Sequence, residues 1–189
     1  MDSIPDKRER ILAAASRLIV RNGLQCSMSA IAEEAGVATG SLYNYFDSKE
    51  ALVRGVYGRV AEEMNERLAV PPDPAQSHEE RVRGYIARYI DFIWEDSLRA
   101  RLFDYLDNNP LITLEDAAAI FGPFVDHAIE MIAKAQEAGI LRQGSATLLA
   151  SFMRGAIRNT LKRRRIVEDP LTGEERALIA SMCWNAIAA

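Results

Sequence analysis

The chain has 189 residues, of which 49% are hydrophobic and 26% charged, enough apolar side chains to bury a core without disulfides. A pI near 5.3 excludes a histone-like or polybasic protein that coats nucleic acid, although it allows a local nucleic-acid site. Two distant cysteines, no signal-peptide pattern at the N-terminus and no uncharged apolar stretch of about 18 residues lead us to expect a cytoplasmic protein with free thiols and no membrane span.

The predicted elements are all helical, because apolar residues recur every three to four positions and no segment alternates as a strand. The first helix is expected to open at Asp6, with Glu9 completing a capping box, and to end at Asn22-Gly23. Further helices are expected at 28–35, 39–46, 48–68, 79–95, 97–107, 114–138, 145–164 and 173–188. The sequence therefore predicts an all-α protein.

Two breaks organise these helices. The proline-rich stretch 70–77 cannot continue a helix, and it follows the long helix that links a small N-terminal head to a larger body. We expect a DNA-binding domain at 1–50 and an effector-binding and dimerisation domain at 51–189. Within the body, Gly122-Pro123 is expected to interrupt or kink its helix, while Gly139 caps that helix and Thr172 with Glu175 opens the last one.

The segment MSAIAEEAGVATGSLYNYFD, residues 28–47, carries the functional signal. A helix-turn-helix unit needs a small residue in its first helix, a glycine in its turn and a branched apolar residue in its second helix. Ala32, Gly36 and Leu42 occupy these places at the required spacing. The pattern predicts that the second helix enters the major groove of DNA. A plain helical core with surface aromatic residues is the alternative.

The predicted outer side of the second helix carries Tyr43, Asn44 and Tyr45. Tyrosine hydroxyls can bind phosphates while the rings contact sugars or a thymine methyl group. Lys49 is expected in the first turn of the next helix, after a capping pair of Asp47 and Glu50. A cation there opposes the helix dipole unless a phosphate binds beside it, and a solvated surface lysine is the alternative.

Residues 11–52 resemble the TetR family of transcriptional regulators. The matching residues are Ile11, Ala14, Ala15, Gly23, Ile31, Ala32, Ala35, Gly36, Val37, Gly40, Leu42, Tyr43, Tyr45, Phe46, Ser48, Lys49 and Glu50. The resemblance implies a homodimer whose heads read a palindromic operator on double-stranded DNA, and a helical body that binds a small effector and then releases the DNA. It implies DNA contacts at Ser27, Met28, Ala38, Thr39, Gly40, Ser41, Tyr43, Asn44, Tyr45 and Lys49. Cys26 stands where the family commonly has a capping threonine, so Ser27 is expected to cap instead.

The body offers two weaker signals. Aromatic residues suit a pocket for an apolar or aromatic effector, although each of them also suits a plain core. These residues are Tyr85, Tyr89, Phe92, Phe103, Phe121 and Phe124. Apolar positions on the last two helices suit either a four-helix dimer interface or packing within the chain. These positions are Leu149, Phe152, Ala156, Ile179, Met182 and Cys183.

Other chemistry has little support in the sequence. His78 and His127 lack neighbours at metal-ligand spacing, and no nucleotide-binding or hydrolase motif occurs, so we expect no metal, no cofactor and no enzymatic activity. The basic run Lys162–Arg165 ends a helix, where cations complement the dipole, and we interpret it as structural. The predicted function is a ligand-responsive repressor. An activator or effector-independent repressor is the first alternative, and a helical enzyme or carrier is the second.

Overall fold

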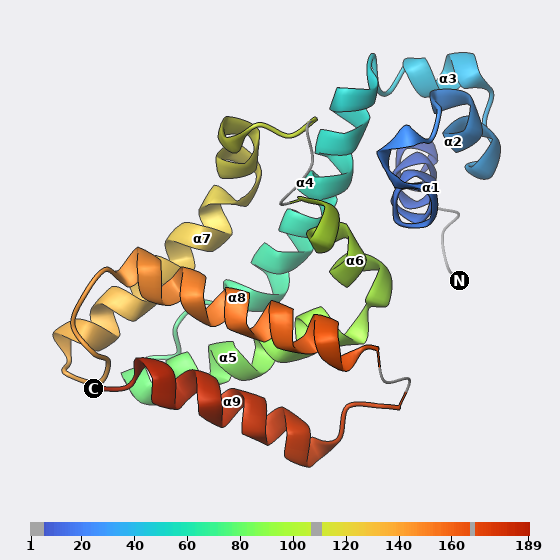
Figure 1. Ribbon diagram of the computed structural model, residues 1–189. Coiled ribbons are helices and arrows are strands. Elements are labelled where there is room, and N and C mark those ends of the chain that lie inside the picture. Colours follow the sequence, from blue (N-terminus) through green and yellow to red (C-terminus); the bar gives the residue numbers. More distant parts are fainter. Residues whose placement is uncertain (1–5, 107–110, 167–168) are drawn as a thin grey trace. The chain divides into compact units, whose positions relative to one another are not determined.

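The computed structural model describes residues 6–106, 111–166 and 169–189. Within these ranges the chain is helical, and its only β contact is an isolated bridge between Leu141 and Ala188. The helices are α1 (Lys7–Asn22), η1 (Gly23–Gln25), α2 (Met28–Glu34), α3 (Thr39–Tyr43), α4 (Lys49–Leu68), α5 (His78–Glu95), α6 (Ser97–Leu106), α7 (Leu114–Glu137), α8 (Ala146–Arg164) and α9 (Gly173–Ile187) (Figure 1). The all-α prediction is confirmed. None of the helices in the described ranges is long and apolar enough to cross a membrane.

The chain divides into two compact units, Met1–Glu62 with Arg101–Phe121 and Glu63–Ala100 with Gly122–Ala189. The helices α4, α6 and α7 each pass from one unit to the other. The two compact units do not divide at residue 50. The predicted boundary between a DNA-binding domain at 1–50 and an effector-binding and dimerisation domain at 51–189 stays a proposal. The end predicted for the helix 97–107 lies outside the described residues.

In the first unit, α1, α2 and α3 lie together (Figure 1). The apolar stripe of α1 is buried in this unit: Ile11, Leu12 and Ala15 have no exposed surface. Burial of such side chains supplies most of the stability of a small helical unit, at about 1.5–3 kcal/mol for each large one.

In the second unit, α5, α8 and α9 pack side by side. The aromatic face of α5 is buried, with Tyr85 and Ile90 fully enclosed, and its Tyr85 and Tyr89 rings stack against Phe124 of α7. Helix α7 runs through Gly122 and Pro123, so it is not interrupted there, and the alternative of a kink at this point stays a prediction. Proline has no N–H, so one helical hydrogen bond is missing there while the helix continues. The predicted cap is confirmed: Gly139 adopts φ 72°, and its N–H donates to the Gln136 carbonyl at 2.9 Å.

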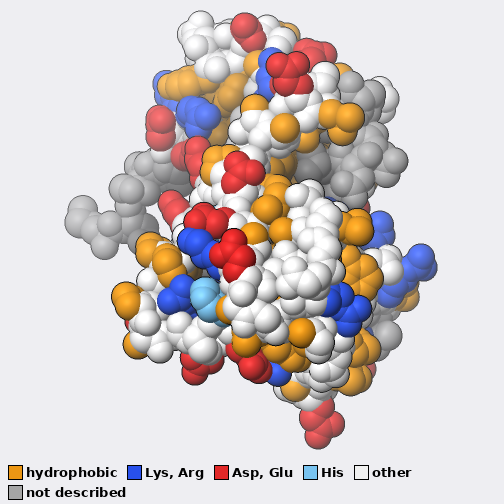
Figure 2. Space-filling model, turned by 90° about the vertical axis from the view of Figure 1, so that its left-hand side faces the viewer, with side chains coloured by type: hydrophobic (Ala, Val, Ile, Leu, Met, Phe, Trp, Pro, Cys, Tyr) orange, Lys and Arg blue, Asp and Glu red, His pale blue; other side chains and the backbone are white. Residues whose placement is uncertain are grey.

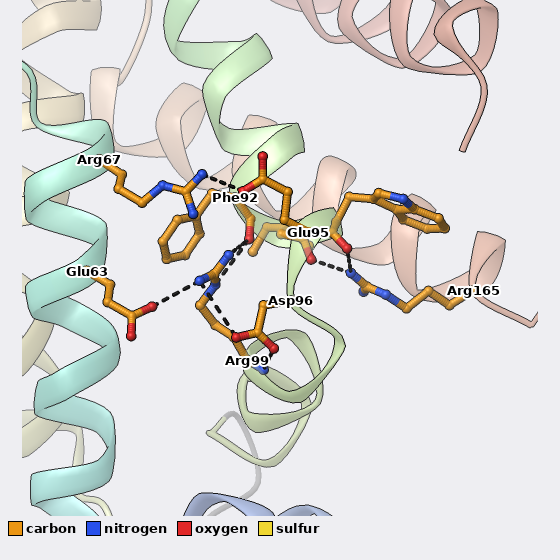
Figure 3. Close-up of polar contacts among 9 residues, drawn as sticks. Glu63, Arg67, Phe92, Glu95, Asp96, Arg99 and Arg165 are labelled. Carbon is orange, nitrogen blue, oxygen red and sulfur yellow. Dashed lines mark hydrogen bonds and ion pairs between the residues drawn. The ribbon is translucent and has the colours of Figure 1, made fainter. Parts of the chain in front are cut away.

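Two arginines hold the C-terminal end of α5 (Figure 3). Arg99, buried over the Phe92 ring at 3.7 Å, donates to the Phe92 carbonyl and pairs with Glu63 at 2.9 Å. Arg165 donates to the carbonyls of Ile93 and Trp94. The last carbonyls of a helix lack partners within the helix and carry partial negative charge, so these cations satisfy both needs. The structural interpretation of the basic run is supported at Arg165, which acts on α5 rather than on its own helix.

Candidate nucleic-acid interface

The helix-turn-helix unit is built around a small core. Ile31, Ala32, Leu42 and Phe46 are at most 5% exposed, so the two short helices and the turn are fastened from inside. Helix α3 ends at Tyr43 rather than at residue 46, and turns follow it. The backbone N–H of Phe46 still donates to the Leu42 carbonyl at 3.0 Å, so the segment after α3 keeps a helical turn's bond.

The turn between α2 and α3 depends on Gly36. Its φ of 64° lies in the left-handed region, which most L-residues avoid. A Cβ at this position would also lie 3.3 Å from Arg10 Nη2. Arg10, on α1, donates to the carbonyls of Ala35 and Gly36, at 2.8 Å each from Nη2. One side chain therefore fastens the end of α2 and the turn to α1.

The outer side of α3 is open to solvent. Tyr43 at the end of α3 is 49% exposed and Tyr45, two residues further on, is 42% exposed, while the preceding Leu42 has no exposed surface. Ala38, Thr39 and Asn44 are also exposed, and Ser41 is half-buried. The predicted division between inward and outward positions is therefore what the structure shows.

Gly40 has no structural need to be glycine within its own chain. Its φ is not positive, and an added Cβ would meet no atom within 4 Å. A glycine inside a helix costs about 0.5–1 kcal/mol relative to alanine. Because nothing in the fold requires a glycine here, Gly40 fits a place where another molecule comes close to the backbone.

Three predicted residues lie at helix starts. Ser27 caps α2, as expected, because its hydroxyl accepts from the Ala30 N–H at 3.1 Å, and Met28 opens that helix half-buried. Lys49 opens α4, but its ammonium donates to the Leu24 carbonyl. The pairing of Asp47 with Glu50 is wrong: Ser48 caps α4, its hydroxyl accepting from the Ala51 N–H at 3.1 Å.

Lys49 also lies close to Cys26. The Cys26 thiol is buried, and burial raises its pKa despite the nearby ammonium. A thiol with a raised pKa is largely protonated at neutral pH and therefore a poor nucleophile. The described residues also contain no group of three or more His, Cys, Asp or Glu side chains that could hold a metal ion.

Sequence reasoning missed Arg10. It stands beside the buried Ile11, but its hydrogen-bond acceptors lie 25 and 26 positions further along the chain. Helical periodicity marks which face of α1 is buried and gives no information on where a long side chain reaches. Two other arginines of α1, Arg17 and Arg21, pair with Glu34 of α2 at 2.9 and 3.1 Å. The hydrogen bond from Arg17 lowers the pKa of the Glu34 carboxyl.

The six aromatic residues predicted for an effector pocket are all buried, and they fall into three groups. Tyr85, Tyr89 and Phe124 stack with ring centroids 6.1–6.3 Å apart. Phe103 and Phe121 pair at 6.2 Å in the other unit, and Phe92 lies under Arg99. Their role in binding an effector stays a prediction.

The predicted dimer residues also differ in exposure. Phe152 and Met182 are 54% and 50% exposed, Leu149 and Ala156 are half-buried, and Ile179 and Cys183 pack inside their own chain. Two more apolar residues that the sequence also predicts for the dimer interface are exposed: Leu148 is 67% and Leu178 59% exposed. We call Leu148, Phe152, Leu178 and Met182 the α8–α9 apolar face.

Comparison with known proteins agrees with this geometry. Residues 11–56 match the family described as bacterial regulatory proteins, tetR family. The transcriptional repressor KstR of Rhodococcus jostii is 40% identical over 68 residues, 35% of this chain and 32% of that protein. The transcriptional activator FasR of Mycolicibacterium smegmatis is 30% identical over 115 residues, 60% of this chain and 51% of that protein. The chain thus matches about half or less of the length of these relatives.

Likeness in fold extends over the whole chain. The crystal structure of AibR in complex with isovaleryl coenzyme A and operator DNA superposes with a TM-score of 0.74 at 21% identity. It covers 96% of this chain and 97% of that one. The body of the molecule therefore shares the helical fold of that protein.

Proposed function

We propose, from the match of residues 11–56 to the tetR family of bacterial regulatory proteins, that the whole chain is a homodimeric transcriptional repressor. It binds a palindromic operator in the cytoplasm and leaves it when a small molecule binds the body. The observation that carries the proposal is the outer side of α3, where Tyr43 and Tyr45 stand exposed beside Gly40, which no contact within the chain requires.

The DNA contacts come from α3 and from the starts of α2 and α4. Thr39, Ser41 and Asn44 offer hydrogen-bonding groups to base edges, and the tyrosines offer hydroxyls to phosphates. Ser27 already caps its helix and its hydroxyl also hydrogen-bonds the Ser29 hydroxyl at 2.9 Å, so a phosphate contact would have to share or replace that second bond. Lys49 must exchange the Leu24 carbonyl for a phosphate, so its contribution is the difference between two hydrogen bonds.

Dimerisation supplies the second half-site. Two recognition helices must lie about one duplex turn apart, roughly 34–36 Å, to read a palindrome together. The α8–α9 apolar face gives each protomer a surface for a twofold interface, since its four large side chains are each at least half exposed in their own chain. An effector that changes the spacing of the two heads by a few ångströms would end simultaneous docking.

The alternative is an activator, or a repressor without an effector. The similarity to the transcriptional activator of Mycolicibacterium smegmatis supports the activator alternative, because it covers 115 residues and so extends past the DNA-binding region. A reporter gene under the protein's own upstream DNA separates the two directions. Deletion of the protein raises expression if it represses and lowers expression if it activates.

The test of specific DNA reading is a fluorescence-anisotropy titration with DNA from upstream of the protein's own gene, beside an unrelated duplex. We expect roughly 10³-fold or greater preference for the specific duplex. Tyr43→Ala should weaken specific binding roughly 10- to 100-fold, since a contact of this kind is worth about 1–3 kcal/mol. Tyr43→Phe separates the hydroxyl from the ring. Equal, strongly salt-dependent binding to both duplexes would contradict the proposal.

A further inference from the structure

A cavity of about 230 Å³ opens in the second unit between the linker after α4, the start of α5 and the middle of α7. Both histidines of the chain, His78 and His127, line it, together with Arg81, Arg88 and Lys134. Figure 2 shows a histidine side chain bordered by Lys and Arg side chains on this side of the molecule. The whole chain carries a formal charge of −4, so this gathering of nitrogen groups stands out from the rest of the protein.

The nitrogen-bearing side chains of the cavity come from matching faces of two helices. Arg81 and Arg88 are seven positions apart on α5, and His127 and Lys134 are seven apart on α7. Residues at this spacing lie on one face, two turns apart. Each helix therefore presents a pair of nitrogen-bearing side chains to the same cavity.

The two arginines have no carboxylate partners in the part of the chain that the structure describes. Arg81 is held by the linker, because its Nη2 donates to the Asp73 backbone carbonyl at 2.7 Å, while its buried Nε has no hydrogen-bond partner. Arg88 lies across Gly84, where an added Cβ would be 3.1 Å from Nη1. A buried donor without a partner is costly, so the Arg81 guanidinium is poised for an acceptor that enters the cavity. Arg88 is exposed and lines the same cavity, so it can bind that acceptor without leaving a partner within the chain.

The carboxylates at the cavity are already engaged. Glu130 binds Lys134 at 2.6 Å, and the Asp73 side chain accepts from the Ala75 N–H at 2.9 Å. With neutral histidines, the three cations exceed the two carboxylates by one charge. His127 is neutral at pH 7 because burial, helped by Arg88 and Lys134 and opposed by Glu130, lowers its pKa. An anion in the cavity would favour the protonated form of this imidazole.

The remaining lining is apolar. Met131 on α7 and Val70, Pro71 and Pro72 of the linker complete the wall. The volume is just below the roughly 300–1,000 Å³ of pockets for drug-sized ligands, so it suits a small molecule. A few charged anchors in a partly apolar wall are typical of a site that binds an amphipathic metabolite.

We propose that this cavity binds a small organic anion, whose carboxylate or phosphate is held by Arg81 and Arg88 while its short apolar portion lies against Met131 and the linker prolines. The binding site itself follows from these contacts. That the anion is the effector that releases DNA rests on the proposed function. The site differs from the predicted aromatic pocket. Tyr85 lies between Arg81 and Arg88 in the sequence of α5, but its ring stacks against Tyr89 and Phe124 and does not line the cavity.

The test is an NMR titration of the full-length protein in which the two imidazole Cε1–H signals report on the cavity. Benzoate is the carboxylate probe, inorganic phosphate the phosphate probe, benzamide the neutral isostere of benzoate, and sodium chloride the ionic-strength control. We expect a saturable shift of the His127 signal and a rise of its pKa with benzoate or phosphate, and neither change with benzamide or chloride. A variant His78→Gln assigns the two signals.

The control variants separate a built site from general charge attraction. Arg88→Gln should weaken the binding of the anion roughly 10- to 100-fold, as expected for a lost charge-assisted hydrogen bond. Arg163→Gln removes an exposed cation from α8, away from the cavity, and should leave binding unchanged. If neither anion shifts the signals beyond chloride, or if both variants weaken binding equally, the inference is wrong.

Anisotropy on the DNA complex keeps this failure distinct from failure of the proposed function. Binding of the anion by the free protein together with its release of specific DNA supports both proposals. Specific DNA binding without any anion effect on the imidazoles overturns the cavity and leaves the DNA-binding function in place. Anion binding by a protein that shows no preference for specific DNA would support the cavity and overturn the proposed DNA-binding function.

Discussion

Arg10 shows how much one side chain contributes to the geometry of the reading head. Its guanidinium bridges α1 to two carbonyls, of Ala35 at the end of α2 and of Gly36 in the turn. These carbonyls have no helical partners, and a guanidinium presents several donors in a fixed fork. Arg10 therefore positions α3 without itself lying on the outer side of that helix.

We predict that Arg10→Gln weakens DNA reading through the turn. The loss of charge-assisted bonds to part-buried carbonyls should lower the free energy of unfolding by about 1–3 kcal/mol. It should reduce binding to the specific duplex more than binding to an unrelated one, since only specific reading needs an exact placement of α3. Urea unfolding and anisotropy titrations measure the two effects.

The matched control is Arg17→Gln on the same helix. Arg17 is exposed, and its partner Glu34 keeps Arg21, so the change should cost at most about 1 kcal/mol. If Arg10→Gln behaves like Arg17→Gln in both measurements, the bonds to the turn contribute little, and α3 is placed by its apolar core alone.

Residue types with a fixed local role could be predicted from the sequence. Spacing alone assigned Leu42 to the core and Tyr43 and Tyr45 to the surface, because a helix converts sequence position into direction. Long cations could not be placed in this way. Arg10, Lys49 and Arg165 each end on a backbone carbonyl at least 25 positions away, and only the tertiary fold brings those acceptors within reach.

At the scale of elements, the capping predictions show what the sequence pattern leaves open. The box of Thr172 and Glu175 forms at the start of α9. The box expected at Asp6 does not: this residue precedes α1 without a side-chain hydrogen bond, and Glu9 pairs instead with Arg8 and Arg59 at 3.4 and 3.5 Å. The sequence pattern alone therefore does not decide whether a capping box closes, since Glu175 closes its box while also pairing with Arg164.

The pH dependence of α9 follows from its box. Glu175 accepts from Arg164 at 2.6 Å and from the Thr172 N–H at 2.9 Å, and chiefly the arginine lowers the pKa of its carboxyl to about 2. The folded pKa lies below the unfolded value near about 4.3. The resulting stabilisation is therefore complete above that unfolded value and disappears as the pH falls through about 2.

We predict that Glu175→Gln lowers the urea midpoint at pH 7, and that the gap to the wild type shrinks steadily between about pH 5 and pH 2. Protein concentration is held constant, because dimerisation shifts apparent stability. Glu174→Gln, an exposed neighbour in the same first turn, should show a much smaller gap. A gap for Glu175→Gln that is independent of pH would mean that the amide loses packing rather than charge.

At the scale of the whole molecule, the α8–α9 apolar face is the largest feature that a single chain leaves unexplained. Leu148 and Phe152 are one turn apart on α8, and Leu178 and Met182 are one turn apart on α9. The two helices pack against each other, so the four side chains make one surface. Grouped exposed hydrophobic residues of this kind mark an interaction site, and a twofold axis lets the same face cover itself.

The last prediction is that Phe152→Glu converts the protein to a monomer. Burial of a phenylalanine contributes about 1.5–3 kcal/mol, and a twofold interface contains the residue twice. The dissociation constant of the dimer should therefore rise by roughly two to four powers of ten. Light scattering after size exclusion measures the mass directly. Leu114→Glu is the matched control, since Leu114 is 92% exposed on α7 and is not one of the residues of the α8–α9 apolar face.

The same variant tests whether operator reading needs two heads. A monomer that keeps its own fold should retain half-site contacts but lose the gain from binding two half-sites together, so specific affinity falls while the helical circular dichroism spectrum is unchanged. A Phe152→Glu protein of unchanged dimeric mass would move the interface elsewhere. A monomer with full operator affinity would keep the interface and contradict the reading of a palindrome by paired heads.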